Sequence, residues 1–207
     1  MLHPDHKPNT PLVLVACECS GTVRDAFIAR GIDAISCDIK PTRVPGPHFM
    51  CDMFLLDLNV FDLVIAFPPY TAICTSGNGH YRNTAERVAG AEFFKRIWDS
   101  PVAKLAIENP VNIINGFYPS LPKPYYIQPY YFGHPVSKKT GIWSRGLPQL
   151  EPERVLTPHP NNGTDNYSGK GEALREARSN TFFDVAKAMA KQWGDILLEE
   201  YSNGRTS

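Results

Sequence analysis

A short apolar run that stops at two prolines is the feature that most constrains the fold. Residues 61–67 are nearly all apolar, too short to cross a membrane and rich in residues that favour strands. Pro68 and Pro69 cannot donate to a strand ladder, so the strand must end there. Tyr70 and Cys74 are therefore predicted on a loop past the carboxyl end of a buried strand, where open α/β sheets bind ligands. A core strand followed by a stiff surface turn is the alternative for this stretch taken alone.

Strand-like and helix-like segments alternate along the rest of the chain. The predicted strands are residues 11–16, 33–37, 49–51, 61–67 and 102–107, and the predicted helices are residues 23–30, 84–98 and 182–198. This alternation predicts an α/β fold with a Rossmann-like, mostly parallel sheet and helices on both faces. Residues 125–132 and 140–143 are expected to add an antiparallel strand pair near the C-terminal end.

Three details of these elements are specific enough to be checked. Residues 75–83 are expected to form a loop. The 84–98 helix, capped by Thr84, is expected to turn the following side chains inward: Ala85, Val88, Ala89, Phe93 and Ile97. Four tyrosines could line a partner surface or alternate in burial along an edge strand: Tyr125, Tyr126, Tyr130 and Tyr131.

Composition favours one globular domain. The chain has 207 residues, of which 43% are hydrophobic and 20% charged. We expect residues 1–10 to be a flexible tail and residues 11–201 a single domain, with a loop over 151–172 and a helix over 180–198 that packs back on the sheet. A formal net charge of zero gives no strongly basic footprint for nucleic acid, although local basic patches are compatible with it.

The five cysteines form no even framework of disulfides, and no apolar leader precedes residue 11. With no long apolar run either, a cytoplasmic location and no membrane partner are expected. No metal is expected, because Cys17 and Cys19 are a lone pair and the histidines lack zinc spacing.

Polar residues at the ends of the predicted strands suggest a nucleoside site. Ser20 and Gly21 form a strand–helix turn that a ligand could approach closely. Asp38 could accept hydrogen bonds from a ribose diol, and Asp52 could bind an adenine amino group; exposed loop acids are the alternative for both. No glycine-rich phosphate loop is present, which argues against NAD and ATP and leaves a nucleoside cofactor without phosphates.

The predicted substrate side lies on two other strand ends. Glu108 follows an apolar strand and could hold a proton for the ring nitrogen of a base, or it could form a surface pair with an arginine. Asn109 could orient Glu108 or accept a hydrogen bond from the backbone. Cys74 could be a nucleophile or an inert thiol, and Tyr70 could stack on a base or simply be a rim aromatic.

These motifs resemble those of S-adenosylmethionine-dependent methyltransferases, most of all a short, phage-type form of the cytosine-5 DNA methyltransferases. Residues 13–27 resemble the first motif, in which a strand meets a glycine turn and a helix. Residues 67–70 fall on the Phe-Pro-Cys catalytic motif, and residues 107–110 resemble the Glu-Asn-Val motif that grips cytosine. Residues 182–193 are similar to the last motif, a helix beside the first strand.

The resemblance implies a methyltransferase-type sheet, S-adenosylmethionine as cofactor, and a nucleobase substrate in DNA or in a nucleotide, within a host cytoplasm if the chain is viral. It implies cofactor contacts from Glu18, Ser20, Gly21, Asp38, Ile39, Asp52, Met53, Phe67 and Pro68. It implies substrate contacts from Pro69, Asn109 and Pro110, and catalytic roles for Glu108, Cys74 and Tyr70.

Several positions depart from the family pattern. Tyr70 stands where the family has its catalytic cysteine, and Cys19 replaces a glycine of the first motif. Residues 68–70 also resemble the Asp/Asn-Pro-Pro-Tyr motif of amino-group methyltransferases, with Phe67 in place of the acceptor. Only about 40 residues separate the strand pair from the final helix, so the recognition region of the family is almost absent. Two alternatives therefore stay open: an inactive binding module, and an enzyme of other nucleotide or base modification chemistry.

Overall fold

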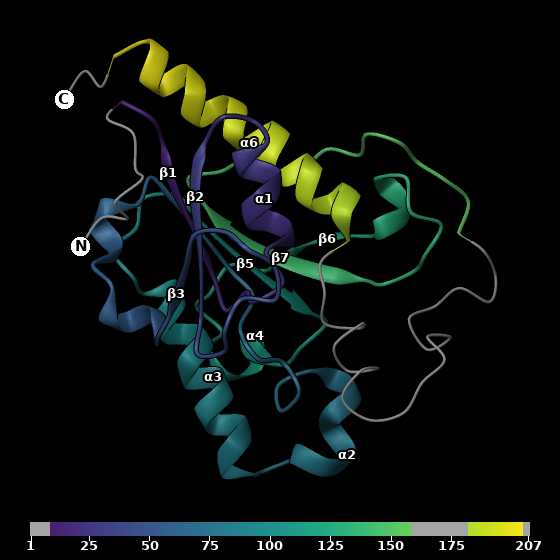
Figure 1. The fold of residues 1–207 in the computed structure, drawn as a ribbon. Helices are drawn as coiled ribbons and strands as arrows, with labels where there is room; N and C mark the ends of the chain where they lie inside the picture. Colours follow the sequence, from purple (N-terminus) through teal and green to yellow (C-terminus); the bar gives the residue numbers. More distant parts are fainter. Residues whose placement is uncertain (1–8, 159–181, 205–207) are drawn as a thin grey trace.

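The computed structural model describes residues 9–158 and 182–204, and within them a single seven-stranded sheet organises the chain. The strand order is β3-β2-β1-β4-β5-β7-β6 (Figure 1). The strands are β1 (Leu12–Ala16), β2 (Asp33–Asp38), β3 (His48–Met50), β4 (Leu63–Ala66), β5 (Leu105–Pro110), β6 (Tyr125–Ile127) and β7 (Thr140–Arg145). The first five pair in parallel, whereas β7 is antiparallel to both β5 and β6. This confirms the expected Rossmann-like α/β fold, with a mostly parallel sheet and an antiparallel strand pair near the C-terminal end.

The centre of the sheet is apolar on both faces, as parallel strands between two helical layers must be. All five residues of β1 and all four of β4 are buried. The two strands pair in register, with Val15 opposite Ile65. The apolar run before Pro68 is therefore a central strand, and Phe67 keeps one more ladder contact by donating its N–H to the Ala16 carbonyl over 3.0 Å.

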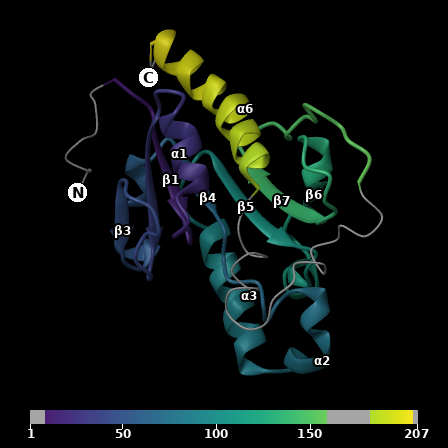
Figure 2. The ribbon, with the colours of Figure 1, turned by 45° about the vertical axis from the view of Figure 1, so that its right-hand side comes forward.

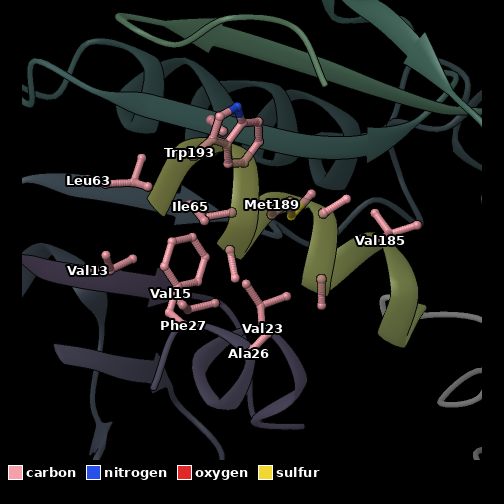
Figure 3. Close-up of a cluster of buried hydrophobic side chains, with 14 of the residues drawn as sticks. Val13, Val15, Val23, Ala26, Phe27, Leu63, Ile65, Val185, Met189 and Trp193 are labelled. Atoms are coloured by element: carbon pink, nitrogen blue, oxygen red, sulfur yellow. The ribbon is translucent and has the colours of Figure 1, made fainter. Parts of the chain in front are cut away.

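Helices cover the two faces separately. Helices α1 (Thr22–Ile28) and α6 (Phe183–Ser202) lie together on one face, and α3 (Ala85–Trp98) lies on the other (Figure 2). In the first layer Val185, Met189 and Trp193 of α6 meet side chains of α1 and of the sheet (Figure 3). That layer joins these further residues: Val13, Val15, Val23, Ala26, Phe27, Leu63 and Ile65. The last helix thus packs beside the first strand, as predicted.

The buried face of α3 differs from the predicted one. Of the predicted inner residues, Ile97 is buried and Phe93 half-buried, whereas Ala85, Val88 and Ala89 are exposed. The helix also buries Arg87, Ala91 and Phe94. The spacing is helical in both cases, but the prediction excluded charged residues from the inner face. Arg87 lies there because its guanidinium has polar partners in the loop after β4, which are described below.

Residues 75–83 are not simply a loop. They contain a 3-10 helix, η3 (Thr75–Gly77), and a short α-helix, α2 (Asn78–Tyr81). The other short helices are η1 (Met53–Leu55), η2 (Leu58–Val60), α4 (Ile114–Phe117) and η4 (Pro129–Tyr131). Thr84 caps α3 as expected, because its hydroxyl accepts a hydrogen bond from Arg87 N–H over 3.3 Å.

Strand β5 runs further than predicted. It continues through Glu108, Asn109 and Pro110, since β7 supplies an antiparallel partner and Pro110 pairs with Thr140. Side chains alternate across a strand, so Glu108 and Asn109 point to opposite faces of the sheet. The expected tail over 1–8, loop over 159–172 and first residues of the 180–198 helix lie outside the described residues.

No helix in the described ranges is long and apolar enough to cross a lipid bilayer. In the same ranges, no three His, Cys, Asp or Glu side chains gather in a way that would hold a metal ion.

Candidate functional site

The turn after β1 is held by a buried carboxylate. Glu18 is only 6% exposed, and its carboxylate accepts hydrogen bonds from Val23 N–H and from the Ser20 hydroxyl, both over 2.8 Å. Burial raises the pKa of Glu18, and these hydrogen bonds act in the opposite direction. Glu18 and Ser20, both predicted to contact a cofactor, are thus placed at the start of α1, where they satisfy backbone groups that the helix leaves unpaired.

Gly21 is required by the backbone and by its neighbours. Its φ of +77° is left-handed, and a Cβ there would come within 2.6 Å of both the Arg24 guanidinium and a Val44 methyl group. Arg24 and Val44 therefore occupy the space on this side of Gly21, where a ligand was predicted to approach closely.

Arg24 organises the loop that follows β2. Its guanidinium is fully buried and donates to the Ser36 hydroxyl over 3.2 Å and to the Pro45 carbonyl over 3.2 Å. The loop also crosses the first turn, where Arg43 N–H donates to the Cys19 carbonyl over 2.8 Å. The sequence gives no signal for this role of Arg24, because its partners are scattered hydroxyls and carbonyls that form no recognisable motif.

The carboxyl ends of β1, β2 and β3 converge on one thiol. Cys17 follows β1 in a left-handed conformation, with φ of 56°. Burial raises its pKa to about 12, and the nearby carboxylates of Asp38 and Asp52 contribute to that shift. Cys37 and Cys51 adjoin the same region, with their Sγ atoms 3.9 Å apart. Two acids predicted for a nucleoside therefore lie around the end of the first strand.

Both acids already make one local hydrogen bond. Asp38 accepts from Lys40 N–H over 2.9 Å, and Asp52 accepts from Phe54 N–H over 3.0 Å at the start of η1. A carboxylate has capacity for several donors, so each can take a ligand hydroxyl or amine as well. Of their predicted neighbours, Ile39 is 76% exposed, whereas Met53 is 3% exposed and packs in the core below α3.

The loops after β4 and β5 are tied together. Asn109 is fully buried, and its amide donates to the Pro68 carbonyl over 3.2 Å. Thr75 N–H donates to the Val111 carbonyl over 3.0 Å, and Ile113 N–H donates to the Ile73 carbonyl over 3.1 Å. The two predicted substrate segments therefore form one structural unit.

Within this unit the two candidate reactive side chains have different settings. The Cys74 thiol is buried, 3.1 Å from the Ser76 hydroxyl and 3.5 Å from the Thr71 carbonyl. Tyr70 is half-buried beside the core on the α3 face, while Pro69 is exposed and Pro68 buried. Phe67 packs on the other face, toward α6.

Arg87 holds this loop from α3. Its Nε donates to the Ala72 carbonyl over 2.7 Å, and its Nη1 donates to the Asn78 side-chain oxygen over 2.9 Å. Its Nη2 is buried and has no partner among residues 9–158 and 182–204. The sequence analysis missed Arg87, because an arginine at helical spacing looks like an ordinary surface residue.

Glu108 lies on the α6 face of β5, beside a small cavity that it lines with Lys138, Thr140, Phe182 and Val185. Burial raises the pKa of the Glu108 carboxyl, and the Lys138 ammonium and the Thr140 hydroxyl pull it part of the way back. Pro110 ends the strand next to Thr140. The predicted pair of Glu108 with a surface arginine is replaced by Lys138 and Thr140, neither of which the sequence analysis singled out.

The structure therefore brings the predicted residues together in two groups. Cys17, Asp38 and Asp52 gather at the ends of β1 to β3, and the Pro68–Cys74 loop joins Asn109 at the ends of β4 and β5. A cavity of about 260 Å³ lies elsewhere, lined by Asp62, Lys104 and Tyr201. Its polar groups are already engaged: Asp62 accepts from Leu12 N–H and from the Tyr201 hydroxyl, over 2.8 and 2.7 Å.

Comparisons with known proteins add little to this picture. No family model and no curated protein matches the sequence. Among solved structures, the chain resembles one from E. coli that is provisionally described as a DNA modification methyltransferase encoded within a prophage. The two share 13% sequence identity with a TM-score of 0.47, over 72% of this chain and 52% of that one, so the chain spans about half its length. The functional proposal therefore rests on the geometry of the chain itself.

Proposed function

We propose that this chain is a methyltransferase that uses S-adenosylmethionine and acts on a nucleobase, in DNA or in a nucleotide. The observation that carries the proposal is that Cys17, Asp38 and Asp52 stand at the neighbouring carboxyl ends of β1, β2 and β3. Ligands of open α/β sheets bind outside the carboxyl ends of the strands, near the point where strand order reverses. Here that point lies between β1 and β4, directly beside this group.

The polar groups present suit a nucleoside without phosphates. Asp38 would accept the ribose hydroxyls, and Asp52 would accept the adenine amino group, each beside the local bond that it already makes. Gly21 would act indirectly, because Arg24 and Val44 fill the space in front of it. When bound, S-adenosylmethionine supplies an electrophilic methyl group.

On the substrate side, Glu108 would hold a proton against the ring nitrogen of the base. Its raised pKa favours the protonated carboxyl, which can donate a hydrogen bond. Asn109 would fix the Pro68–Cys74 loop rather than contact the base, because both ends of its amide are already bonded within the chain. Tyr70 would provide a stacking wall, and Cys74 is the candidate nucleophile. Because Tyr70 packs on the α3 face and Glu108 lies on the α6 face, the base would have to lie across the ends of β4 and β5.

Isothermal titration calorimetry with S-adenosylmethionine tests the cofactor. We expect binding by the wild type and a clear loss of affinity in Asp52→Asn. Asp57→Asn is the matched control, because Asp57 caps the 3-10 helix η2 in the same way, with a bond of 3.1 Å from Asn59 N–H. No heat of binding at millimolar cofactor would refute the proposal.

A catalytically inactive binding module is the second candidate. Two observations favour it: Tyr70 occupies the family's cysteine position, and the Cys74 thiol is buried among polar groups of its own loop. Mass spectrometry of nucleosides from DNA, with and without the gene expressed, separates the candidates. A modified base that disappears in Cys74→Ser supports the enzyme with a thiol nucleophile; its persistence assigns the chemistry to another group, and no modified base supports the module.

A further inference from the structure

One long stretch of the chain carries no acidic side chain at all. From Asn109 to Leu150 there is no Asp or Glu, although the whole chain has equal numbers of acidic and basic residues. The same stretch holds Lys123, Lys138, Lys139 and Arg145, together with five tyrosines. A neutral protein thus concentrates a local excess of positive charge and aromatic rings in the segment that follows Glu108.

Part of this excess is displayed on the edge of the sheet. Tyr126 lies on β6, the strand at one edge of the sheet, and is 42% exposed. The Lys139 ammonium lies 4.3 Å from the centre of its ring. Lys123 is exposed just before β6, and among the described residues neither Lys123 nor Lys139 forms an ion pair with an acid. We refer to Lys123, Tyr126 and Lys139 as the edge surface.

The other members of the stretch are engaged elsewhere. Arg145 donates to the Trp98, Ser100 and Val102 carbonyls at the far end of β7. The Lys138 ammonium lies near Glu108. The two tyrosines of β6 alternate as an edge strand requires: Tyr125 packs against the core, and Tyr126 points away from it. Tyr131 packs against the core from the 3-10 helix η4.

The edge surface is continuous with the substrate side of the candidate site. Lys139 precedes Thr140, which pairs with Pro110 at the end of β5. Pro110 follows Asn109, whose amide holds the Pro68 carbonyl. Tyr126 pairs with Gly141, and so does Asn109, which puts both side chains on the same face of the sheet.

We propose that the edge surface binds a single-stranded nucleic acid and leads it to the candidate site. This inference rests on the proposed function for its choice of substrate. An exposed aromatic ring beside cations is the pattern that binds unpaired strands. A base would stack on Tyr126 once the exposed Lys139 ammonium, which now lies over the ring, moves to a phosphate. In a duplex the base faces are covered by their neighbours, so Tyr126 would have nothing to stack on. The few cations involved also fit a strand that is held through a small number of phosphates.

Fluorescence anisotropy with a labelled oligonucleotide of about 20 nucleotides tests the surface. The probes are one mixed sequence as single-stranded DNA, as RNA and as duplex DNA. We expect both single strands to bind more tightly than the duplex, and the stronger of the two identifies the polymer. Tyr126→Ala should weaken binding about tenfold. Lys139→Gln should weaken binding and reduce the slope of log affinity against log salt by about 0.7.

The matched control is a second lysine–aromatic pair of the same geometry. Lys187 lies 4.3 Å from the ring centre of Phe183 on α6, next to Asp184 and outside the acid-free stretch. Phe183→Ala and Lys187→Gln should leave the affinity unchanged. Tighter binding of the duplex, no binding of any probe, or equal losses in the control variants would overturn the inference.

Because the probes are tested without cofactor, this result is separate from that of calorimetry. If the protein binds single strands but not S-adenosylmethionine, the inference about the edge surface holds and the proposed function fails. If it binds the cofactor but no single strand, the proposed function holds and the inference about the edge surface fails. Circular dichroism of each variant shows that the fold is kept, which is expected because the substituted side chains are exposed.

Discussion

The Asn109 amide donates a hydrogen bond to the Pro68 carbonyl oxygen over 3.2 Å, from a side chain that is fully buried. Its oxygen accepts in turn from the Asn112 amide over 3.0 Å. One side chain thus joins the carboxyl ends of two neighbouring parallel strands, at the point where both leave the sheet. The loop that carries Tyr70 and Cys74 is positioned from β5 as much as from its own strand.

Asn109→Ala should lower the free energy of unfolding by about 1–3 kcal/mol, because it leaves the Pro68 carbonyl buried without its donor. Urea unfolding measures the loss. Hydrogen exchange should also become faster at the Thr75 and Ile113 amides, whose bonds join the same two loops. Asn115→Ala is the control, since its amide binds the Leu121 and Pro122 carbonyls instead. Equal exchange at both amides in the two variants would contradict the assigned role.

Gly21 and Gly31 have almost the same backbone conformation but different surroundings. Substituting each by alanine therefore distinguishes the cost of backbone strain from the cost of steric crowding. Gly21 has φ of +77° and Gly31 has φ of +78°, but a Cβ would meet Arg24 and Val44 at Gly21 and nothing within 4 Å at Gly31. Gly31→Ala should cost about 1 kcal/mol, the penalty of a left-handed alanine. Gly21→Ala should cost clearly more, because the Arg24 guanidinium must also move. Thermal unfolding of both variants measures the difference, and equal losses would show that the crowding is relieved at no cost.

The stability of the protein should depend on pH through Glu108. Its pKa is raised in the folded state, chiefly by burial, so the folded chain holds this proton more tightly than the unfolded chain. The resulting stabilisation is complete below the ordinary pKa of a glutamate and is lost as the pH rises through the raised value. Glu108→Gln removes the titration. The free energy of unfolding of the wild type, minus that of the variant, should therefore decrease as pH increases.

Urea unfolding at a series of pH values measures this difference. Glu92→Gln, an equivalent substitution on the exposed side of α3, serves as the reference. A difference that grows with pH would mean that Lys138 and Thr140 outweigh burial at this carboxyl.

Alkylation of Cys17 should report the two acids around it. Its thiol reacts only as the thiolate, and a pKa of about 12 keeps that form scarce at neutral pH. Asp38→Asn removes a negative charge that contributes to the shift, so the rate of iodoacetamide labelling at Cys17 should rise. Peptide mass spectrometry resolves the five cysteines. Asp33→Asn, at the opposite end of β2, is the control, and an equal rise there would mean that Asp38 is not near the thiol.

The parts of the fold that were predictable are those in which one strand or helix carries its own signal. The apolar runs of β1 and β4 and the prolines at 68 and 69 define the sheet centre without any knowledge of their partners. The end of β5 could not be found in this way. Glu108 and Asn109 look like turn residues, and only the pairing with β7 keeps them in the strand.

The candidate site was predictable to a similar degree. Asp38 and Asp52 were found because each follows a strand, and the order of strands then brings them together. Arg24 and Arg87 were missed, because a buried arginine is recognised by carbonyls and hydroxyls that come from distant residues. Arg24 also explains why residue 21 is a glycine, because a Cβ there would meet its guanidinium. The sequence alone suggested that a ligand approaches closely at this position.

The position of α6 has a consequence for synthesis on the ribosome. Helix α6, which covers Val13 and Ile65, follows β7 in the chain, whereas Val13 belongs to β1, the first strand of the described residues. Until α6 is translated, only α1 covers this face of the nascent sheet, so a chaperone has access to the rest of it. A ribosome stalled after β7 would therefore display an aggregation-prone intermediate, and only translation of the last helix would remove that hazard.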